Sequence, residues 1–226
     1  MVIRSVRSGS ASAQAERPNY KRARAVLGAD FLTPEEVIAT RGIFYDDEQL
    51  KALDGGFPTD EEIVRLQKTG CLLMPNPSCP LGLVLVRALN TELFFMRDDA
   101  GWNMEKARNP FVVNDKTEVA TWLAIRKDVV PGSTNLGLED QLGCLSGVER
   151  VPNAAEVAWA LTTYWGARGV YLMCTTYGRT SSVDAHGQRV IGGNFDGKGL
   201  RFCNWSDNAR NQHLGVFAAM MLSVRA

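Results

Sequence analysis

The hydrophobic period of the chain changes at Gly169, and this change constrains the fold more than any other feature. Upstream, apolar residues recur at helical spacing, most clearly over residues 154–169, where Pro152 and Asn153 open the segment and Gly166 and Gly169 end it. Downstream, short runs rich in β-branched and aromatic residues alternate with glycine, as in strands. This order predicts an α+β fold in which helices flank twisted antiparallel sheets.

Capping signals place two helices near the start of the folded part. Thr33 precedes a proline and two glutamates, which predicts a helix to about Arg41. Thr59 and Glu62 have the spacing of a capping box, which predicts a helix over 59–68. The pattern over 80–89 fits a helix or a strand, and we favour a helix because Leu83, Val86 and Leu89 share a face. Periodicity and the Gly and Pro positions predict the other elements: strands over 71–75, 92–95 and 118–127, a short helix over 140–145, and four C-terminal strands over 170–177, 187–193, 200–205 and 214–225.

The N-terminal 25 residues carry six Lys or Arg against one Glu, together with a stretch of Ser, Ala and Gly. Such a segment buries too little apolar area to offset the entropy of ordering it. We therefore expect a flexible basic tail over 1–26 and one domain over 27–226. A tail that binds nucleic acid or another partner is the alternative.

Bulk composition excludes several functional classes. The formal net charge is zero, so no global field recruits nucleic acid, and contact with nucleic acid is expected only as weak binding by the basic tail. No run of eighteen apolar residues suggests a membrane span, and the N-terminus lacks the apolar segment of a secretory signal. We expect a protein without membrane partners, located in the cytoplasm.

The cysteines and histidines form no recognisable reaction centre. The five cysteines are widely spaced without a CxxC pair, which indicates free thiols, and Cys174 reads as a small buried strand residue. Neither His186 nor His213 lies near a nucleophile-elbow or papain-like motif. Asp184 and His186 would supply only two of the four ligands that structural zinc needs. GxGxxG and GxxxxGK[ST] are both absent. The sequence therefore predicts a binding protein rather than an enzyme, with no metal and no cofactor.

Residues 192–215 place small polar side chains between aromatic ones. If residues 200–205 are extended, Leu200 and Phe202 face one side of the strand while Arg201 and Cys203 face the other. One face would pack on the core and the other would meet a partner. Asparagine and serine offer adaptable hydrogen bonds, as they do in antibody loops, although each Asn alone also fits a turn.

The end of the chain, RVIGGNFDGKGLRFCNWSDNARNQHLGVFAAMML, resembles the terminal segment of the C-type lectin fold as used by the variable proteins of diversity-generating retroelements. It is similar, more distantly, to the sulfatase-modifying, formylglycine-generating group. The likeness extends to Val130–Thr134 and Val151–Ala154, so it covers most of residues 57–226. The residues that carry it in the terminal segment are Val190, Gly193, Phe195, Gly199, Leu200, Phe202, Trp205, Asp207, Arg210, Leu214, Gly215 and Val216.

The resemblance implies a protein that displays a variable surface over about 190–213 and performs no chemistry. Its ligand would be a macromolecule, most simply another protein. The implied scaffold residues are Phe195, Leu200, Phe202, Trp205 and Arg210. The implied ligand-binding residues, all of types that adenine changes in an AAC codon produce, are Asn194, Arg201, Cys203, Asn204, Ser206, Asn208, Asn211 and His213.

Departures from related families limit what the resemblance implies. The Glu-Pro-Asn and Trp-Asn-Asp signatures of calcium-dependent lectins are missing, so calcium-dependent sugar binding is not implied. The paired cysteines of formylglycine-generating enzymes are not recognisable, but an oxidative enzyme that uses Cys174 or Cys203 remains the alternative from another class. A receptor-binding tip of a phage is a third possibility. The sequence names neither the ligand nor the oligomeric state.

Overall fold

The computed structural model describes residues 17–95 and 109–223. Within these ranges helices and two four-stranded sheets confirm the predicted α+β class. The helices are α1 (Pro18–Leu27), α2 (Pro34–Arg41), α3 (Asp47–Gly55), α4 (Asp60–Thr69), α5 (Leu83–Leu89), α6 (Phe111–Asn114), α7 (Leu138–Leu142) and α8 (Ala154–Arg168), with short 3-10 helices η1 (Gly28–Asp30) and η2 (Thr91–Leu93). The strands are β1 (Cys71–Pro75), β2 (Trp122–Arg126), β3 (Glu149–Arg150), β4 (Tyr177–Val183), β5 (Arg189–Asp196), β6 (Gly199–Trp205), β7 (Leu214–Val216) and β8 (Ala219–Met220).

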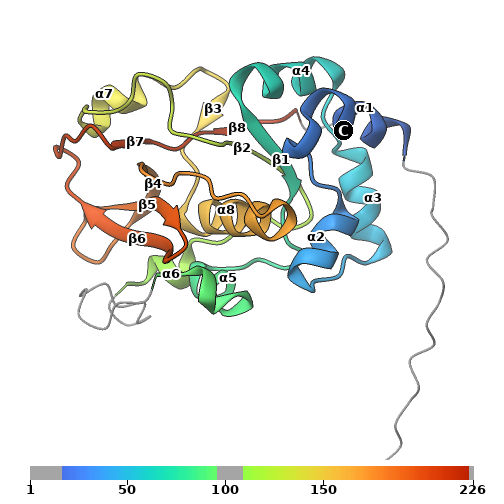
Figure 1. Ribbon diagram of the computed structural model, residues 1–226, viewed down its shortest axis with the longest axis horizontal. Coiled ribbons are helices and arrows are strands. Elements are labelled where there is room, and N and C mark those ends of the chain that lie inside the picture. Colours follow the sequence, from blue (N-terminus) through green and yellow to red (C-terminus); the bar gives the residue numbers. More distant parts are fainter. Residues whose placement is uncertain (1–16, 96–108, 224–226) are drawn as a thin grey trace, which may run out of the picture.

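The two sheets differ in their strand directions. The first has the order β1-β2-β8-β3, and all its pairs are antiparallel. The second has the order β6-β5-β4-β7, in which β4 and β7 run parallel, so the prediction of purely antiparallel sheets is wrong for this pair. Helices α1 to α4 gather at one end of the molecule, and the second sheet lies with α7 at the other end (Figure 1).

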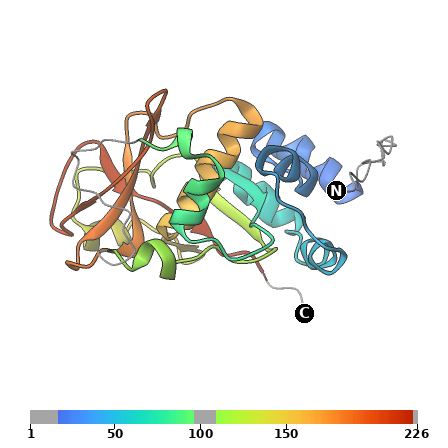
Figure 2. The ribbon, with the colours of Figure 1, turned by 90° about the horizontal axis from the view of Figure 1, so that it is seen from below.

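Helix α8 lies between these two ends and packs on strands and on helices α2 and α5 (Figures 1 and 2). Asn153 and Glu156 form its capping box, and Gly169 ends it at a φ of 67°. The fully buried Trp159 donates its indole N–H to the carbonyl of Pro75 at 3.1 Å. The helix continues through Gly166, which was predicted to end it. A Cβ at Gly166 would lie 2.5 Å from the methyl group of Thr40, so the glycine allows α8 to pack closely against α2.

The N-terminal helix α1 is part of the core, and the prediction of a flexible tail over 1–26 is wrong for residues 18–26. Tyr20 is 2% exposed, and its ring lies 5.1 Å from that of Phe57 and 5.6 Å from that of Phe31. Arg24 donates to the carboxylate of Glu36 at 2.9 Å. Burial and aromatic contacts offset the entropy cost of ordering this segment, although its composition suggested that they could not. The first sixteen residues of the predicted tail lie outside the described ranges.

The capped helices and the strand over 71–75 form as predicted, and so do the helix within 80–89 and the strands within 118–127 and 200–205. The short helix predicted over 140–145 lies further upstream as α7. The strand predicted over 187–193 begins two residues later, at the start of β5, and continues to Asp196. Two strand predictions are wrong. Residues 92–95 form η2 and a single bridge from Phe94 to Leu200, and residues 170–176 are irregular, with Met173 at a φ of 57°. The stretch predicted as one strand over 214–225 forms β7 and β8, which belong to different sheets.

No helix in the described ranges is long and apolar enough to cross a membrane.

Candidate ligand-binding surface

The β5–β6 hairpin positions the residues predicted from the C-terminal stretch. Gly192 pairs with Phe202 and Val190 with Asn204, so these side-chain positions lie on one face of the sheet. Arg201 and Cys203 occupy the opposite face. The alternation predicted for Leu200, Phe202, Arg201 and Cys203 is therefore present in the strand.

The predicted scaffold residues differ in how deeply they are buried. Phe195 and Leu200 are in the core at 0% and 1% exposure, while Phe202 and Trp205 are half-buried. Arg210 is exposed, and its guanidinium lies 3.6 Å from the carboxylate of Asp140. An exposed ion pair of this kind contributes little to stability, so Arg210 is corrected from the scaffold to the surface.

The segment over 206–213, which we call the display loop, follows β6 and carries the most accessible predicted residues. Ser206, Asn208 and His213 are exposed, as is Gln212, while Asn211 is half-buried. The side-chain oxygen of Asn211 accepts the main-chain N–H of His213 at 2.8 Å. Asn211 therefore shapes a turn in addition to any role at the surface.

The main chain of the display loop is tied to distant segments by backbone hydrogen bonds. The N–H of Leu138 donates to the carbonyl of Asp207 at 2.8 Å, and that of Asn135 donates to the carbonyl of Asn211 at 2.9 Å. The N–H of Tyr177 donates to the carbonyl of His213 at 2.7 Å. These bonds use groups that every residue type carries, so they do not depend on the side chains of the loop.

Two predicted binding residues in the hairpin have structural partners. Asn194 has a φ of 45°, and its side chain lies 3.1 Å from the hydroxyl of Tyr177. Arg201 donates to the carbonyl of Asn194 at 2.5 Å and to the carboxylate of Asp196 at 3.2 Å, and its guanidinium lies 4.5 Å from the centre of the Phe95 ring. Both side chains help to hold the turn between β5 and β6, which limits their freedom to vary.

Asn204 belongs to the framework rather than to the exposed face. It shares a face with Phe202 and donates its amide to the carboxylate of Asp184, which is 6% exposed. Burial of Asp184 opposes ionisation, but hydrogen bonds from Asn204 and from the N–H groups of Gln188 and His186 hold the pKa of this carboxyl below its ordinary value. Asp184 thus has a structural role: its carboxylate accepts the N–H groups of His186 and Gln188 and closes the turn between β4 and β5.

The thiols near the surface differ in accessibility and acidity. Cys174 is exposed on the irregular segment before β4, so its prediction as a small buried strand residue is wrong. Cys203 is half-buried, and burial raises the pKa of its thiol to about 11. The cysteines of the described ranges are unpaired, and those ranges contain no group of three His, Cys, Asp or Glu side chains that could hold a metal ion.

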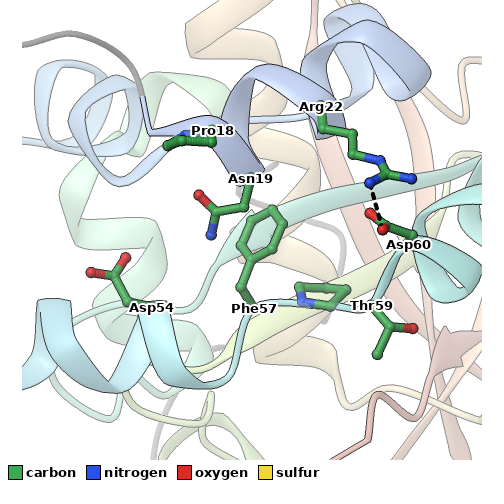
Figure 3. A pocket seen from close by; sticks show the side chains of 8 residues that line it. Pro18, Asn19, Arg22, Asp54, Phe57, Thr59 and Asp60 are labelled. Atoms are coloured by element: carbon green, nitrogen blue, oxygen red, sulfur yellow. Dashed lines mark ion pairs between the residues drawn. The ribbon is translucent and has the colours of Figure 1, made fainter.

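An open cavity of about 330 Å³ lies at the other end of the molecule, between α1, the end of α3 and the start of α4 (Figure 3). Its apolar floor includes Phe57, but its charged groups are already paired. Arg22 lies 2.7 Å from the carboxylate of Asp60, and Arg17 forms an ion pair with Asp54. None of the predicted binding residues lines the cavity, and each of its charged side chains has an ion-pair partner.

Sequence reasoning missed two buried polar residues below the display loop. Arg179 on β4 contacts the loop, and Gln141 on α7 contacts Arg179 and the strand that follows the loop. Both are 0% exposed. A signal was present at Arg179, since an arginine between Gly178 and Thr180 in a strand of small residues needs an internal partner when it is buried. Local sequence does not indicate which segment supplies that partner, because tertiary contacts bring the two together.

Comparison of the chain with protein-family models, with curated proteins and with solved structures finds no match.

Proposed function

We propose that the chain is a non-catalytic ligand-binding protein of the C-type lectin fold, which presents a surface diversified by a retroelement. The observation that carries the proposal is the separation of roles in the display loop. Its main chain is tied to residues 135, 138 and 177, while Ser206, Asn208, Gln212 and His213 are exposed. The α+β class with two small sheets is compatible with the proposed fold.

Because of this separation, the sequence of the display loop can change while its main chain keeps the same conformation. Substitution of an exposed side chain leaves the backbone hydrogen bonds in place, and exposed substitutions usually alter stability by no more than about 0.5 kcal/mol. The amide, hydroxyl and imidazole groups of the loop provide adaptable hydrogen bonding of the kind that antibody loops use. We place the displayed set at the exposed residues Ser206, Asn208, Gln212 and His213. The side chains of Asn194, Asn204 and Asn211 bond within the fold, and we assign them to the framework. The ligand is then a macromolecule, most simply a protein.

A display library tests the binding function directly. Positions 206, 208, 212 and 213 are randomised together, and the library is selected against a panel of purified folded proteins. The matched control is a library at four exposed positions of α4, namely 61, 64, 65 and 68. We expect folded, target-specific binders from the loop library and few from the control. A loop library that loses folded protein, or one that yields binders no more often than the control, would contradict the proposal.

Genomic sequence tests diversification separately. The proposal predicts a second, near-identical copy of the DNA that encodes residues 190–215 close to the gene, differing from it mainly at adenines. Differences spread evenly over all four bases would contradict a retroelement origin while leaving ligand binding open to the library test.

A further inference from the structure

Arg179 lies beneath the display loop and makes its hydrogen bonds with neutral oxygens. Its Nη2 donates to the carbonyls of three loop residues, Ser206 at 3.0 Å, Asp207 at 3.3 Å and Ala209 at 2.7 Å. Its Nη1 donates to the carbonyl of Leu136 at 3.3 Å and to the side-chain oxygen of Gln141 at 2.6 Å. One buried guanidinium thus binds the main chain of the loop and of the segment before α7.

Gln141 orients this guanidinium. Its amide nitrogen donates to the carbonyls of Ser133 at 2.9 Å and Leu214 at 3.1 Å, which leaves its oxygen toward Nη1 of Arg179. The carbonyl of Leu214 belongs to the strand that follows the display loop. The pair therefore contacts the main chain on both sides of the loop, at residues 206–209 and at 214.

The chemistry of the contact suits a loop of changing sequence. Hydrogen bonds from a charged donor are stronger than those between neutral groups, and a guanidinium carries five N–H donors in a rigid plane, whereas a lysine ammonium carries three. Burial lowers the pKa of Arg179, and the carboxylate of Asp207 partly opposes that shift. A carbonyl is present at positions 206, 207 and 209 whatever residue stands there.

We propose that Arg179, oriented by Gln141, is a positioning residue that holds the main chain of the display loop in one conformation independently of the loop's exposed side chains. The purpose assigned to this conformation rests on the proposed function, but the positioning itself does not, because it can be measured without any ligand.

Hydrogen exchange followed by mass spectrometry tests the proposal on the full-length protein. In Arg179→Met, we expect amides of residues 206–214 and their donors at 135 and 138 to exchange about tenfold faster or more, beyond the change in global stability. Arg41→Met is the matched control. Arg41 is also buried, at 6% exposure, but it bonds to Asn90 and Val86 near the end of α5. Its loss should speed exchange near α5 and leave the display loop unchanged.

Two further variants complete the test. Gln141→Met leaves Arg179 in place and should speed exchange in the same loop amides to a smaller degree, which keeps the proposal testable if Arg179→Met does not fold. A quadruple variant with alanine at 206, 208, 212 and 213 should exchange within about twofold of the wild type over 206–214. The proposal is overturned if the quadruple variant loosens the loop as much as Arg179→Met does. It is also overturned if the folded variants of Arg179 and Gln141 leave loop exchange unchanged.

Discussion

The ring of Phe202 on β6 lies over Gly192 on β5, where a Cβ would be 2.6 Å from the nearest ring carbon. A methyl group at this position therefore needs the ring to move. We predict that Gly192→Ala lowers the free energy of unfolding by about 1–3 kcal/mol, the usual cost of overpacking. Urea unfolding of Gly192→Ala, Phe202→Leu and the double variant measures the coupling. A double variant whose loss equals the sum of the single losses would show that the two residues do not interact.

The left-handed backbone of Asn194, with its φ of 45°, predicts an unusual order of stability. Alanine and glycine both remove the side-chain contact with Tyr177, but only alanine is strained at this φ. We expect Asn194→Ala to be less stable than Asn194→Gly by about 1 kcal/mol in thermal or urea unfolding. At Asn208, whose φ is not positive, alanine should be at least as stable as glycine. If Asn194→Ala and Asn194→Gly were equally stable, the backbone at residue 194 would not restrict its side chain, and Asn194 would count among the variable positions.

The buried ion pair of Glu149 on β3 predicts a pH-dependent contribution to stability. Its side chain is 1% exposed and accepts hydrogen bonds from Arg126 at 2.6 Å and from the N–H and hydroxyl of Ser146 at 2.9 Å each. Burial opposes ionisation, but these bonds hold the pKa of Glu149 below its ordinary value. The carboxylate therefore stabilises the fold at neutral pH, and this stabilisation is lost as the pH falls below about 4.5 and through the lowered folded value.

Glu149→Gln should accordingly lower the free energy of unfolding by about 3 kcal/mol at pH 7 and by progressively less below pH 4.5. Urea unfolding between pH 3 and pH 7 measures the difference. Glu61→Gln, at an exposed position of α4, is the control and should change stability little at any pH. A difference between wild type and Glu149→Gln that is constant across this range would contradict the role of the ionised carboxylate.

The thiols should react in an order set by burial. Burial raises the pKa of Cys203 to about 11, so very little of it is thiolate at pH 8, whereas Cys174 is exposed. We predict that iodoacetamide labels Cys203 at least about tenfold more slowly than Cys174, as measured by mass spectrometry of the peptides. Labelling of both at the same rate would favour the oxidative-enzyme alternative, which needs an activated thiol.

Local signals predicted the elements whose ends are set by their own residues. The capping box predicted at Thr59, the N-cap predicted at Thr33 and the helix opening predicted at Asn153 located the starts of α4, α2 and α8. In the structure each is a capping box, closed by side chains three residues apart. Helix α1 could not be predicted in this way. Its apolar face has few members among many charges, and its burial depends on rings such as Phe57, which lies far from it in sequence.

The candidate surface was predictable only in part for the same reason. The alternation in β6 located Leu200 and Phe202 from the sequence, since the side-chain period of a strand is a local property. The contact of Asn204 with Asp184 could not be predicted, because Asp184 comes from another turn. Arg179 was missed because the carbonyls that it binds belong to the display loop and to the segment before α7, which tertiary contacts bring together.

We expect the display loop to accept sequence change and the β5–β6 framework to resist it. A complete substitution scan of residues 190–216, scored by resistance of the displayed protein to protease, measures this directly. Most substitutions at the exposed loop positions should change stability by no more than about 0.5 kcal/mol; these positions are Ser206, Asn208, Gln212 and His213. Truncation of Phe195 or Leu200 should cost about 2–5 kcal/mol. Substitutions at the four loop positions that unfold the protein as readily as those at Phe195 and Leu200 would contradict this expectation.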